Sequence, residues 1–360
     1  MLVGALMARI LGIETTCDET AAAVAQGTRV LSSVVSSQVQ LHAKFRGVVP
    51  EIASRAHIES ILPVLRQAID QAGVKLGDID AVAVAHRPGL IGSLLVGVTA
   101  AKTLAWSLGK PLIGVDHVHA HLYSAMLDHP DTAIPRPTET CPRFPAVGLV
   151  VSGGHTALYA TRSWTDIQRL GTTIDDAVGE AYDKVAAILG LGYPGGPVID
   201  RLAAEGDPEA VRFPRTLLGR QSLDFSFSGI KTSVLYHVQG VPSRAGRRRP
   251  QPCTEQHLRD VCASFQAACV DVLITKVHRA IRRIGAGSVV VGGGVSANRA
   301  LRAALASLPV PAFVPSAQYC TDNAAMTAGL AGLLLAEGHV AGLDLDAETF
   351  SRFAQTSAAL

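Results

Sequence analysis

Two stretches of the chain open with the same order of elements, and this repetition limits the folds that the sequence can adopt. In the first, an apolar run at Ile10–Glu14 leads into the polar turn TTCDET and a second run at Ala21–Ala25. In the second, Val147–Val151 leads into the turn SGGH and the run Thr156–Thr161. Short apolar runs bounded by polar or glycine-rich turns are typical of buried β-strands. The pattern therefore predicts an internally duplicated α/β fold.

Helix-patterned segments follow these strands in both halves. Pro50–Ala72 is a long amphipathic segment that contains Pro63, and Glu255–Ile284 is longer still. Between the halves, residues 128–145 carry five prolines and few apolar side chains, which indicates a linker. A chain of 360 residues is long enough for two domains with separate cores. The other predicted elements are the strands Ile79–Ala85, Leu112–Val115, Ser288–Val291 and Ala312–Val314 and the helices Ser93–Leu108 and Asp175–Leu189.

The segment LIGVDHVHAHLYSAML places histidines at helical spacing. His117 and His121 are four residues apart, so on a helix they lie on one face, about 6 Å apart along the axis. His119 points to the opposite side. Two imidazoles in this relation can bind one transition-metal ion. The alternative is that they are ordinary polar positions of a half-buried helix.

Carboxylates gather at the end of the first strand, where Glu14 is followed by Asp18 and Glu19 in the turn. Turns are often acidic, so these side chains are interpreted as solvated unless another feature makes them catalytic. Late in the chain, TDNAAM predicts a helix with Thr321 as its cap and Asp322 in its first turn. By itself, Asp322 is then no more than a favourable charge at a helix N-terminus.

Glycine-rich turns follow several predicted strands, in HRPGLIGS, SGGH and GGGVSANR. A strand, a glycine turn and a helix start aim backbone N–H groups at an anion. In GGGVSANR the three consecutive glycines allow a ligand to lie on the backbone itself, with Asn298 one turn into the helix.

Charge and cysteine content leave the class of partner open. The net charge of +2 permits an anionic partner without demanding one. Residues 225–254 contain no acid but do contain Arg244 and Arg247–Arg249, so this loop is either solvated surface or a nucleic-acid contact. The six cysteines form no CxxC pair, and the N-terminal MLVGALMARI is unlike a signal peptide. Apolar residues 90–101 are too few to span a bilayer. A reduced cytoplasm is the expected location.

Ten motifs, taken together, resemble one protein family. In chain order they are IETTCDET, FRGVVPEIASRAH, PGLIGSLLVG, DHVHAHL, LVVSGGHT, IDDAVGEAYDKVA, GYPGGP, LDFSFSGIKT, GGGVSANR and CTDNAAM, and they lie between residues 10 and 330. The chain is similar over this span to the bacterial tRNA N6-adenosine threonylcarbamoyltransferase family, once described as O-sialoglycoprotein endopeptidases. The resemblance implies an α/β, actin/Hsp70/sugar-kinase-like fold of two ribonuclease-H-like lobes with a central cleft.

The resemblance also implies which residues act. His117, His121 and Asp322 match the family's metal ligands, which hold one Fe²⁺ per subunit or, alternatively, Zn²⁺. Asp18 and Glu19 match acidic residues implicated in catalysis. The residues that match contacts to the adenylate-type substrate are Val150, Val151, Ser152, Gly153, Gly154, Asp183, Gly196, Asp200 and Asn298.

The implied reaction transfers a threonylcarbamoyl group from threonylcarbamoyl-AMP to N6 of the adenosine 3′-adjacent to the anticodon, in tRNAs reading codons that begin with A. The implied partners are tRNA, a paralogous pseudo-enzyme subunit and a small P-loop ATPase, with no membrane. Residues 8–130, completed by a C-terminal helix at 321–345, are expected to form the N-terminal lobe. Residues 145–320 form the second lobe, and 131–144 form a proline-rich linker.

Two other functions and one departure from the family pattern remain. A metalloendopeptidase is disfavoured because no HExxH is present, so the water-activating glutamate is missing between His117 and His121. A small-molecule kinase or ATPase of the same fold is the stronger alternative, although such enzymes seldom use two histidines for Mg²⁺. The departure is His86-Arg87, which stands where the family usually has small residues before PGL. It is expected to alter the loop or to add a phosphate or tRNA contact.

Overall fold

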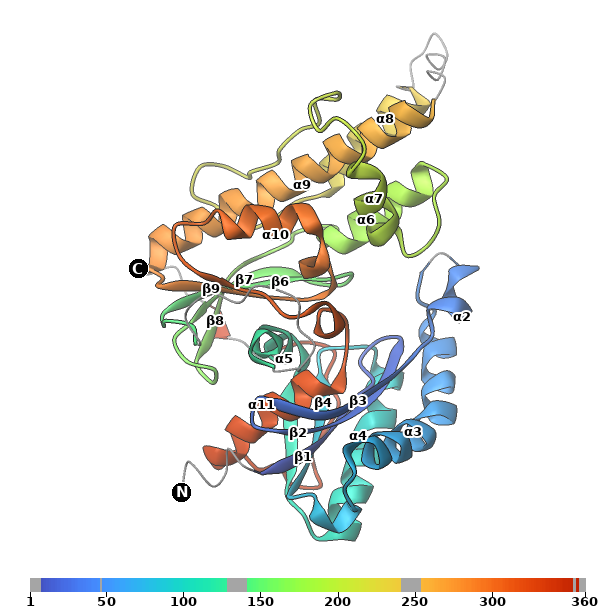
Figure 1. The fold of residues 1–360 in the computed structure, drawn as a ribbon, viewed down its shortest axis with the longest axis vertical. Helices are drawn as coiled ribbons and strands as arrows, with labels where there is room; N and C mark the ends of the chain where they lie inside the picture. Colours follow the sequence, from blue (N-terminus) through green and yellow to red (C-terminus); the bar gives the residue numbers. More distant parts are fainter. Residues whose placement is uncertain (1–7, 46, 128–140, 241–253, 352–353, 356–360) are drawn as a thin grey trace. The chain divides into compact units, whose positions relative to one another are not determined.

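The computed structural model describes residues 8–45, 47–127, 141–240, 254–351 and 354–355 (Figure 1). The chain divides into two compact units. Unit 1 takes its described residues from Met1–Arg136, Arg162–Ile167 and Pro315–Phe353. Unit 2 takes them from Pro137–Thr161, Gln168–Val314 and Ala354–Leu360. The arginine loop 244–249 and most of the predicted linker 131–144 lie outside the described residues.

Unit 1 is built on a five-stranded mixed sheet of order β3-β2-β1-β4-β5. β1, β2 and β3 are antiparallel neighbours, whereas β4 and β5 continue the sheet parallel to β1. The strand bounds are β1 Arg9–Glu14, β2 Glu19–Gln26, β3 Arg29–Ser37, β4 Ala81–Arg87 and β5 Leu112–Asp116. The two parallel strands end at the same sheet edge as β1, so the residues at their carboxyl ends are brought close together.

Helices cover both faces of this sheet (Figure 1). The helix bounds are α2 Val39–Ala43, α3 Pro50–Ala72, α4 Ile91–Leu108, α5 His117–Tyr123 and α11 Ala324–Ala336. Because side chains alternate along a strand, Leu11 packs in the core with α3 and α4, whereas Ile10 packs with α11. Gly12 lies directly against α11, since a Cβ there would be 2.5 Å from the Ala324 carbonyl oxygen. The absence of a side chain lets the helix that follows Asp322 approach β1.

Unit 2 repeats the opening of unit 1 on a second sheet, of order β10-β9-β6-β7-β8-β11. β6 and β7 form an antiparallel pair, and β9 lies parallel to β6 on its other side. The strand bounds are β6 Ala146–Val151, β7 Thr156–Thr161, β8 Ile167–Thr172, β9 Ser288–Gly292, β10 Ala312–Phe313 and β11 Ala354–Gln355. The helix bounds are α6 Val178–Ile188, α7 Gly195–Ala203, α8 Ser228–Gln239, α9 Glu255–Ile284 and α10 Arg299–Ala306. The duplicated α/β architecture is confirmed.

Most predicted boundaries agree with the structure, and the exceptions at Asp175 and Thr321 follow from specific side-chain hydrogen bonds. The helix Glu255–Ile284 has the predicted ends. The predicted helix at Asp175 begins at Val178, because the Asp175 carboxylate instead accepts hydrogen bonds from the start of α8. The prediction that Thr321 caps the last helix is wrong. Asn323 is the cap, since its side-chain oxygen accepts a hydrogen bond from Met326 N at 3.0 Å.

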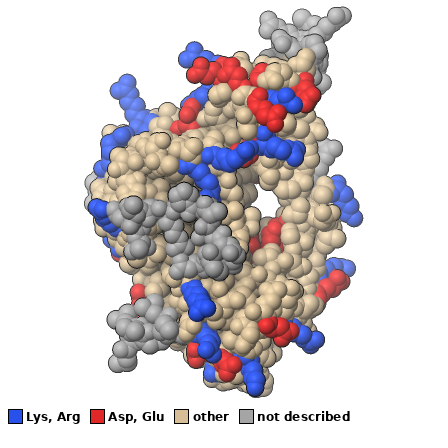
Figure 2. All heavy atoms as spheres, in the orientation of Figure 1, with Lys and Arg blue, Asp and Glu red and all other residues tan. Residues whose placement is uncertain are grey.

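Two of the described helices, α4 and α9, are long and apolar enough to cross a membrane by length and composition. α9 is mostly buried in the core of unit 2, and α4 packs one face on the sheet of unit 1. Core helices of soluble proteins pass the same test, so the two helices are weak evidence for a membrane span. On the face drawn in Figure 2, acidic and basic side chains are interspersed, in keeping with the small net charge.

Candidate metal centre

His117, His121 and Asp322 come together in unit 1. Their ligand atoms all lie within 4.8 Å of one another. Asp322 Oδ1 is 3.1 Å from His121 Nε2 and 3.5 Å from His117 Nε2, and the two imidazole rings meet edge to face with centroids 4.6 Å apart. Both histidines are buried, and Asp322 is partly exposed. Two imidazoles and a carboxylate suit Fe²⁺ or Zn²⁺, with coordination positions left for a substrate.

Local sequence explains how these side chains are positioned. β5 ends at Asp116, whose carboxylate caps α5 by accepting hydrogen bonds from Val118 N and His119 N. The two histidines are then on the same side of a short helix. Asp322 immediately precedes Asn323, the cap of α11, so the start of that helix holds the third carboxylate near the imidazoles.

Glu14 forms a hydrogen bond with His117 of the cluster, a role that the sequence did not predict. Its side chain is fully buried, and Oε2 accepts a hydrogen bond from His117 Nδ1 at 3.0 Å. Its other oxygen accepts from Thr16 N at 2.8 Å. A carboxylate on Nδ1 fixes the tautomer that leaves Nε2 free to bind a cation, as in most metal-binding histidines. The solvated interpretation of Glu14 is therefore wrong. Strand periodicity was the available signal, because Glu14 shares a face with Ile10 and Gly12.

His119 lies apart from the cluster, as its spacing predicted. Its ring is hydrogen-bonded to the backbone of Trp164, and its Nε2 is buried without a hydrogen-bond partner among the described residues. Burial lowers the pKa of His119 to about 4, so the ring is neutral at neutral pH.

The charge of the cluster is set by burial and by its carboxylates. Burial alone lowers the pKa of His117, but the Glu14 and Asp322 carboxylates outweigh burial and raise this pKa to about 9. Burial and the neighbouring His117 lower the pKa of His121. Without a bound cation, His117 therefore carries a proton at neutral pH, and a cation must displace that proton in order to bind.

Asp18 lies in the turn beside the cluster and Glu19 is the first residue of β2, both in unit 1. The turn is held by His57, whose Nε2 donates to Cys17 O at 3.0 Å, and by Leu90 N, which donates to Thr16 O at 2.9 Å. Asp18 is buried. Burial, with the nearby charges of Asp322 and Asp18, raises the pKa of Glu19 to about 9. At neutral pH Glu19 therefore holds a proton when no cation is bound.

The predicted substrate-binding residues all lie in unit 2. Val150 and Val151 are buried at the end of β6, and Ser152 begins the turn to β7 with its N donating to His155 O at 2.7 Å. A Cβ built on Gly153, Gly154 or Gly196 meets nothing within 4 Å, so the backbone of these glycines faces open space. This is the form of a surface on which a ligand can approach the main chain.

The polar members of the predicted set are held in a network. Asp183 accepts a hydrogen bond from Gly195 N at 2.7 Å. Asn298 is the cap of α10, not a residue one turn into it, because its Oδ1 accepts from Leu301 N at 2.9 Å. Its Nδ2 donates to Asp200 Oδ1 at 3.1 Å, and Asp200 also pairs with Arg299. Asp183 thus joins α6 to the start of α7, and the Asn298–Asp200 pair joins α7 to the start of α10.

Gly293 was predicted to make room for a ligand, but the structure shows that its lack of a side chain is required by packing within unit 2. Its φ is 95°, and a Cβ there would be 2.4 Å from the Val151 carbonyl oxygen. The close approach is between β9 and β6 of the same unit, so the glycine is needed by the fold whether or not a ligand lies on this turn.

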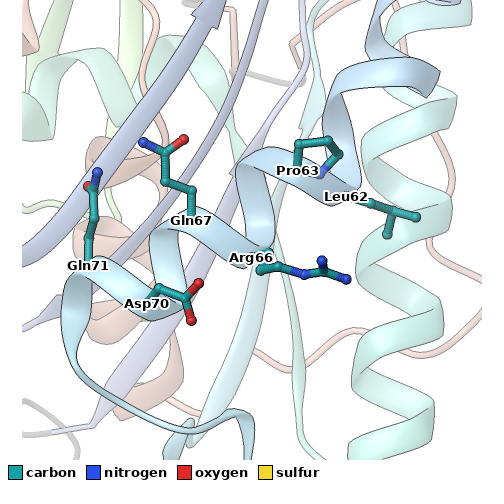
Figure 3. Close-up of a pocket in the computed structure, with 6 residues that line it drawn as sticks. All are labelled: Leu62, Pro63, Arg66, Gln67, Asp70 and Gln71. Atoms are coloured by element: carbon teal, nitrogen blue, oxygen red, sulfur yellow. The ribbon is translucent and has the colours of Figure 1, made fainter.

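A surface hollow on unit 1 is separate from these residues. Figure 3 shows the six side chains that line it, all from successive turns of α3: Leu62, Pro63, Arg66, Gln67, Asp70 and Gln71. Small-molecule sites usually gather polar groups from several elements. A hollow lined by a single exposed helix does not have this form.

Comparison with known proteins identifies the family. A family model described as tRNA N6-adenosine threonylcarbamoyltransferase matches residues 29–329. A protein of that description from Sorangium cellulosum (strain So ce56) is 52% identical over 350 residues, which cover 95% of this chain and 96% of the relative. Another from Anaeromyxobacter dehalogenans (strain 2CP-C) is 49% identical over 95% of this chain and 98% of the relative. The chain belongs to the tRNA N6-adenosine threonylcarbamoyltransferase family.

Solved structures support the fold of this threonylcarbamoyltransferase-family chain. HypF from T. kodakarensis matches with a TM-score of 0.57 and 16% identity, over 92% of this chain and 48% of that one. Component A of the (R)-2-hydroxyglutaryl-CoA dehydratase of Acidaminococcus fermentans matches with a TM-score of 0.50 and 14% identity, over 92% and 99%. At such identities the likeness concerns the fold alone, and it agrees with the predicted actin/Hsp70/sugar-kinase-like fold. The kinase alternative gains no support from it, because fold does not determine function.

Proposed function

We propose that this chain transfers a threonylcarbamoyl group from threonylcarbamoyl-AMP to N6 of the adenosine 3′-adjacent to the anticodon, in tRNAs reading codons that begin with A. The observation that carries the proposal is family membership over almost the whole chain, together with an intact His117, His121 and Asp322 cluster. tRNA is the substrate that the family description names.

His117, His121 and Asp322 would hold one Fe²⁺, with Zn²⁺ as the alternative. The donor set fits such an ion, and Glu14 holds His117 in the tautomer that presents Nε2. When bound, the ion would supply Lewis-acid polarisation of the donor's oxygens. The protein's contribution is to fix the orientation of the imidazoles through the Asp116 cap and the buried Glu14 carboxylate.

In the proposed reaction, the adenosine N6 amine attacks the carbamoyl carbonyl carbon. A C–N bond forms, the bond from that carbon to the phosphate oxygen breaks, and AMP leaves. The amine must lose a proton to a nearby base. We propose that one of the two neighbouring carboxyl groups, Asp18 or Glu19, accepts this proton.

The turn after β6 is proposed to bind the adenylate phosphate through the backbone N–H groups of Gly153 and Gly154. Its test is Gly153→Val, which places a side chain in open space and so should weaken binding of AMP without unfolding unit 2. AMP affinity by calorimetry and metal content are the measurements. Gly293→Val is unsuitable, because its clash with Val151 would disturb the sheet and the ligand surface together. Unchanged AMP affinity in Gly153→Val would remove the turn from the site.

The remaining expectations are part of the same proposal. Residues 8–130 with 321–345 would form one lobe and 145–320 the other, joined by a linker at 131–144. A paralogous pseudo-enzyme subunit and a small P-loop ATPase would be partners, in the cytoplasm and without a membrane.

Two measurements test the function as a whole. Mass spectrometry of tRNA nucleosides should show loss of N6-threonylcarbamoyladenosine in cells depleted of this protein. In a reconstituted assay, transfer to tRNA should require the adenylate donor. Phosphoryl transfer from ATP to a small hydroxylated substrate, with tRNA left unmodified, would instead identify a kinase.

A further inference from the structure

Arg87, the bulky residue that departs from the family pattern, is largely internal. It is the last residue of β4, directly across from Asp116 at the end of β5. Its side chain is only 24% exposed. A guanidinium that reached out for a phosphate would instead be open to solvent. The neighbours of Arg87 therefore indicate what it does.

Its first neighbour is Asp116, the cap of α5, the helix that carries His117 and His121. Arg87 Nε donates to Asp116 Oδ2 at 3.3 Å, and the Asp116 side chain is 9% exposed. The other carboxylate oxygen, Oδ1, accepts from Val118 N at 3.1 Å and His119 N at 3.3 Å. One oxygen is thus held by the guanidinium while the other holds the first turn of α5. A buried carboxylate needs such a charge partner, because desolvation of an unpaired charge is costly.

Its second neighbour is the C-terminal segment, defined here as residues 341–351. Glu348 Oε1 lies 3.6 Å from Arg87 Nη1, and Glu348 N donates to the carbonyl oxygen of His86 at 2.9 Å. His86 Nδ1 in turn donates to Asp346 O at 2.9 Å. Ser351 Oγ donates to Asp116 Oδ1 at 3.2 Å. The His86-Arg87 pair therefore fastens the C-terminal segment at the same point where α5 begins.

We propose that Arg87 is a positioning residue for the metal centre. It neutralises and orients Asp116, and through this cap it fixes the first turn of α5, where His117 lies. It also holds the C-terminal segment against the cap. The inference rests on the proposed metal site, but concerns how the protein shapes it.

Co²⁺ alone is the probe, because its visible absorption reports both occupancy and the arrangement of ligands. In Arg87→Gln, the full-length protein should bind Co²⁺ about tenfold more weakly, because Asp116 loses its charge partner and no longer fixes the first turn of α5, although Arg87 itself touches no proposed ligand. Arg87→Lys keeps the positive charge and should restore most of the affinity. Glu348→Gln is the matched control, because it removes the more exposed ion pair and leaves Arg87 on Asp116. Its affinity for Co²⁺ should equal that of the wild type.

A double-mutant cycle separates charge pairing from general damage to the fold. Asp116→Asn can still cap α5 but carries no charge. In that background Arg87→Gln should cost little further affinity, since the buried charge that Arg87 compensates is gone. Equal Co²⁺ affinity in the wild type and Arg87→Gln would overturn the inference and leave the metal site standing. Equal losses from Arg87→Gln in both backgrounds would also overturn it. A wild type that binds no Co²⁺ would overturn the proposed metal site and this inference with it.

Discussion

Glu14→Gln is the substitution that most directly tests how the cluster works. In the wild type, Glu14 Oε1 accepts from Thr16 N at 2.8 Å and Oε2 accepts from His117 Nδ1 at 3.0 Å. Glutamine has nearly the same shape but one acceptor oxygen in place of two. Either Thr16 N or His117 Nδ1 must then face an NH₂ group. Glu14 is fully buried, so water cannot readily replace the lost acceptor.

Two effects of opposite sign decide how much Glu14→Gln changes the affinity for the metal ion. Loss of a carboxylate behind a metal-binding histidine typically weakens affinity about 10–100-fold, which is about 1.4–2.7 kcal/mol. Against this, the Glu14 and Asp322 carboxylates raise the pKa of His117 to about 9. At pH 7 the cation must displace that proton, which weakens apparent affinity by about 100-fold in the wild type. Removing the Glu14 charge lowers the pKa of His117 and relieves much of this competition.

The expected result is that the affinities of the wild type and Glu14→Gln converge as the pH falls from 9.5 to 7. Between pH 7 and 9 the wild type should gain about tenfold in affinity per pH unit, because one proton is displaced. Glu14→Gln should have a much flatter profile. The variant should therefore be weaker by about 10–100-fold near pH 9.5 and much closer to the wild type at pH 7.

Competition with a chelator of known pH dependence, using Zn²⁺ as the probe, gives both profiles. Asp70→Asn, on the exposed face of α3, is the control and should follow the wild type. Parallel profiles for the wild type and Glu14→Gln would refute the reasoning, since Glu14 would then not set the proton affinity of His117.

Three further predictions concern the cluster and the arginine loop. His121→Ala should lose the bound metal in elemental analysis, whereas His119→Ala should keep it, because His119 lies outside the cluster. In chelator-treated protein, the pKa of His117 is about 9, above its value of 6.5 in the unfolded chain. The ion pair of His117 therefore stabilises the fold fully below pH 6.5, and this stabilisation is lost as the pH rises through about 9. Urea unfolding should show this loss of stability in the wild type, and Glu14→Gln should lack most of it. Replacing Arg247–Arg249 with Glu should weaken tRNA binding and lower the salt slope by roughly one for each lost phosphate contact, and an unchanged slope would return this loop to plain solvated surface.

The fold was largely predictable because its signals are local. Apolar runs, turn residues and helical periodicity located the strands and the long helix Glu255–Ile284 with its correct ends. The error at the start of α6 arises where a distant contact decides. Asp175 is kept out of α6 by hydrogen bonds to Ser226 and Ser228, some fifty positions further along the chain. No window of neighbouring residues contains that information.

In the candidate site, too, the features set by neighbouring residues could be predicted from the sequence, and most of those set by distant contacts could not. The spacing of His117 and His121 predicted a shared helix face, and the structure places them together. Asp322 is 201 positions from His121, so only the family resemblance supplied it. Glu14 was misjudged because a strand-end carboxylate looks solvated until the helix that covers it is known. Asn298 caps α10 and does not lie one turn into it, and Gly293 makes room for β6, a packing role that the sequence did not indicate.

The proposed site residues separate by unit, and this makes the mechanism testable in parts. The residues proposed to bind metal and accept the proton belong to unit 1, whereas those proposed to hold the adenylate belong to unit 2. Each group is built on contacts within its own unit, such as Glu14 with His117 or Asp183 with Gly195. A substitution in one group should therefore leave the binding property of the other intact while transfer to tRNA is lost in both cases. Gly153→Val with full metal content, and His121→Ala with unchanged AMP affinity, are the two results that this separation requires. If His121→Ala also abolished AMP binding, the metal would be part of the nucleotide site itself, and the assignment of the phosphate to the backbone of Gly153 and Gly154 alone would fail.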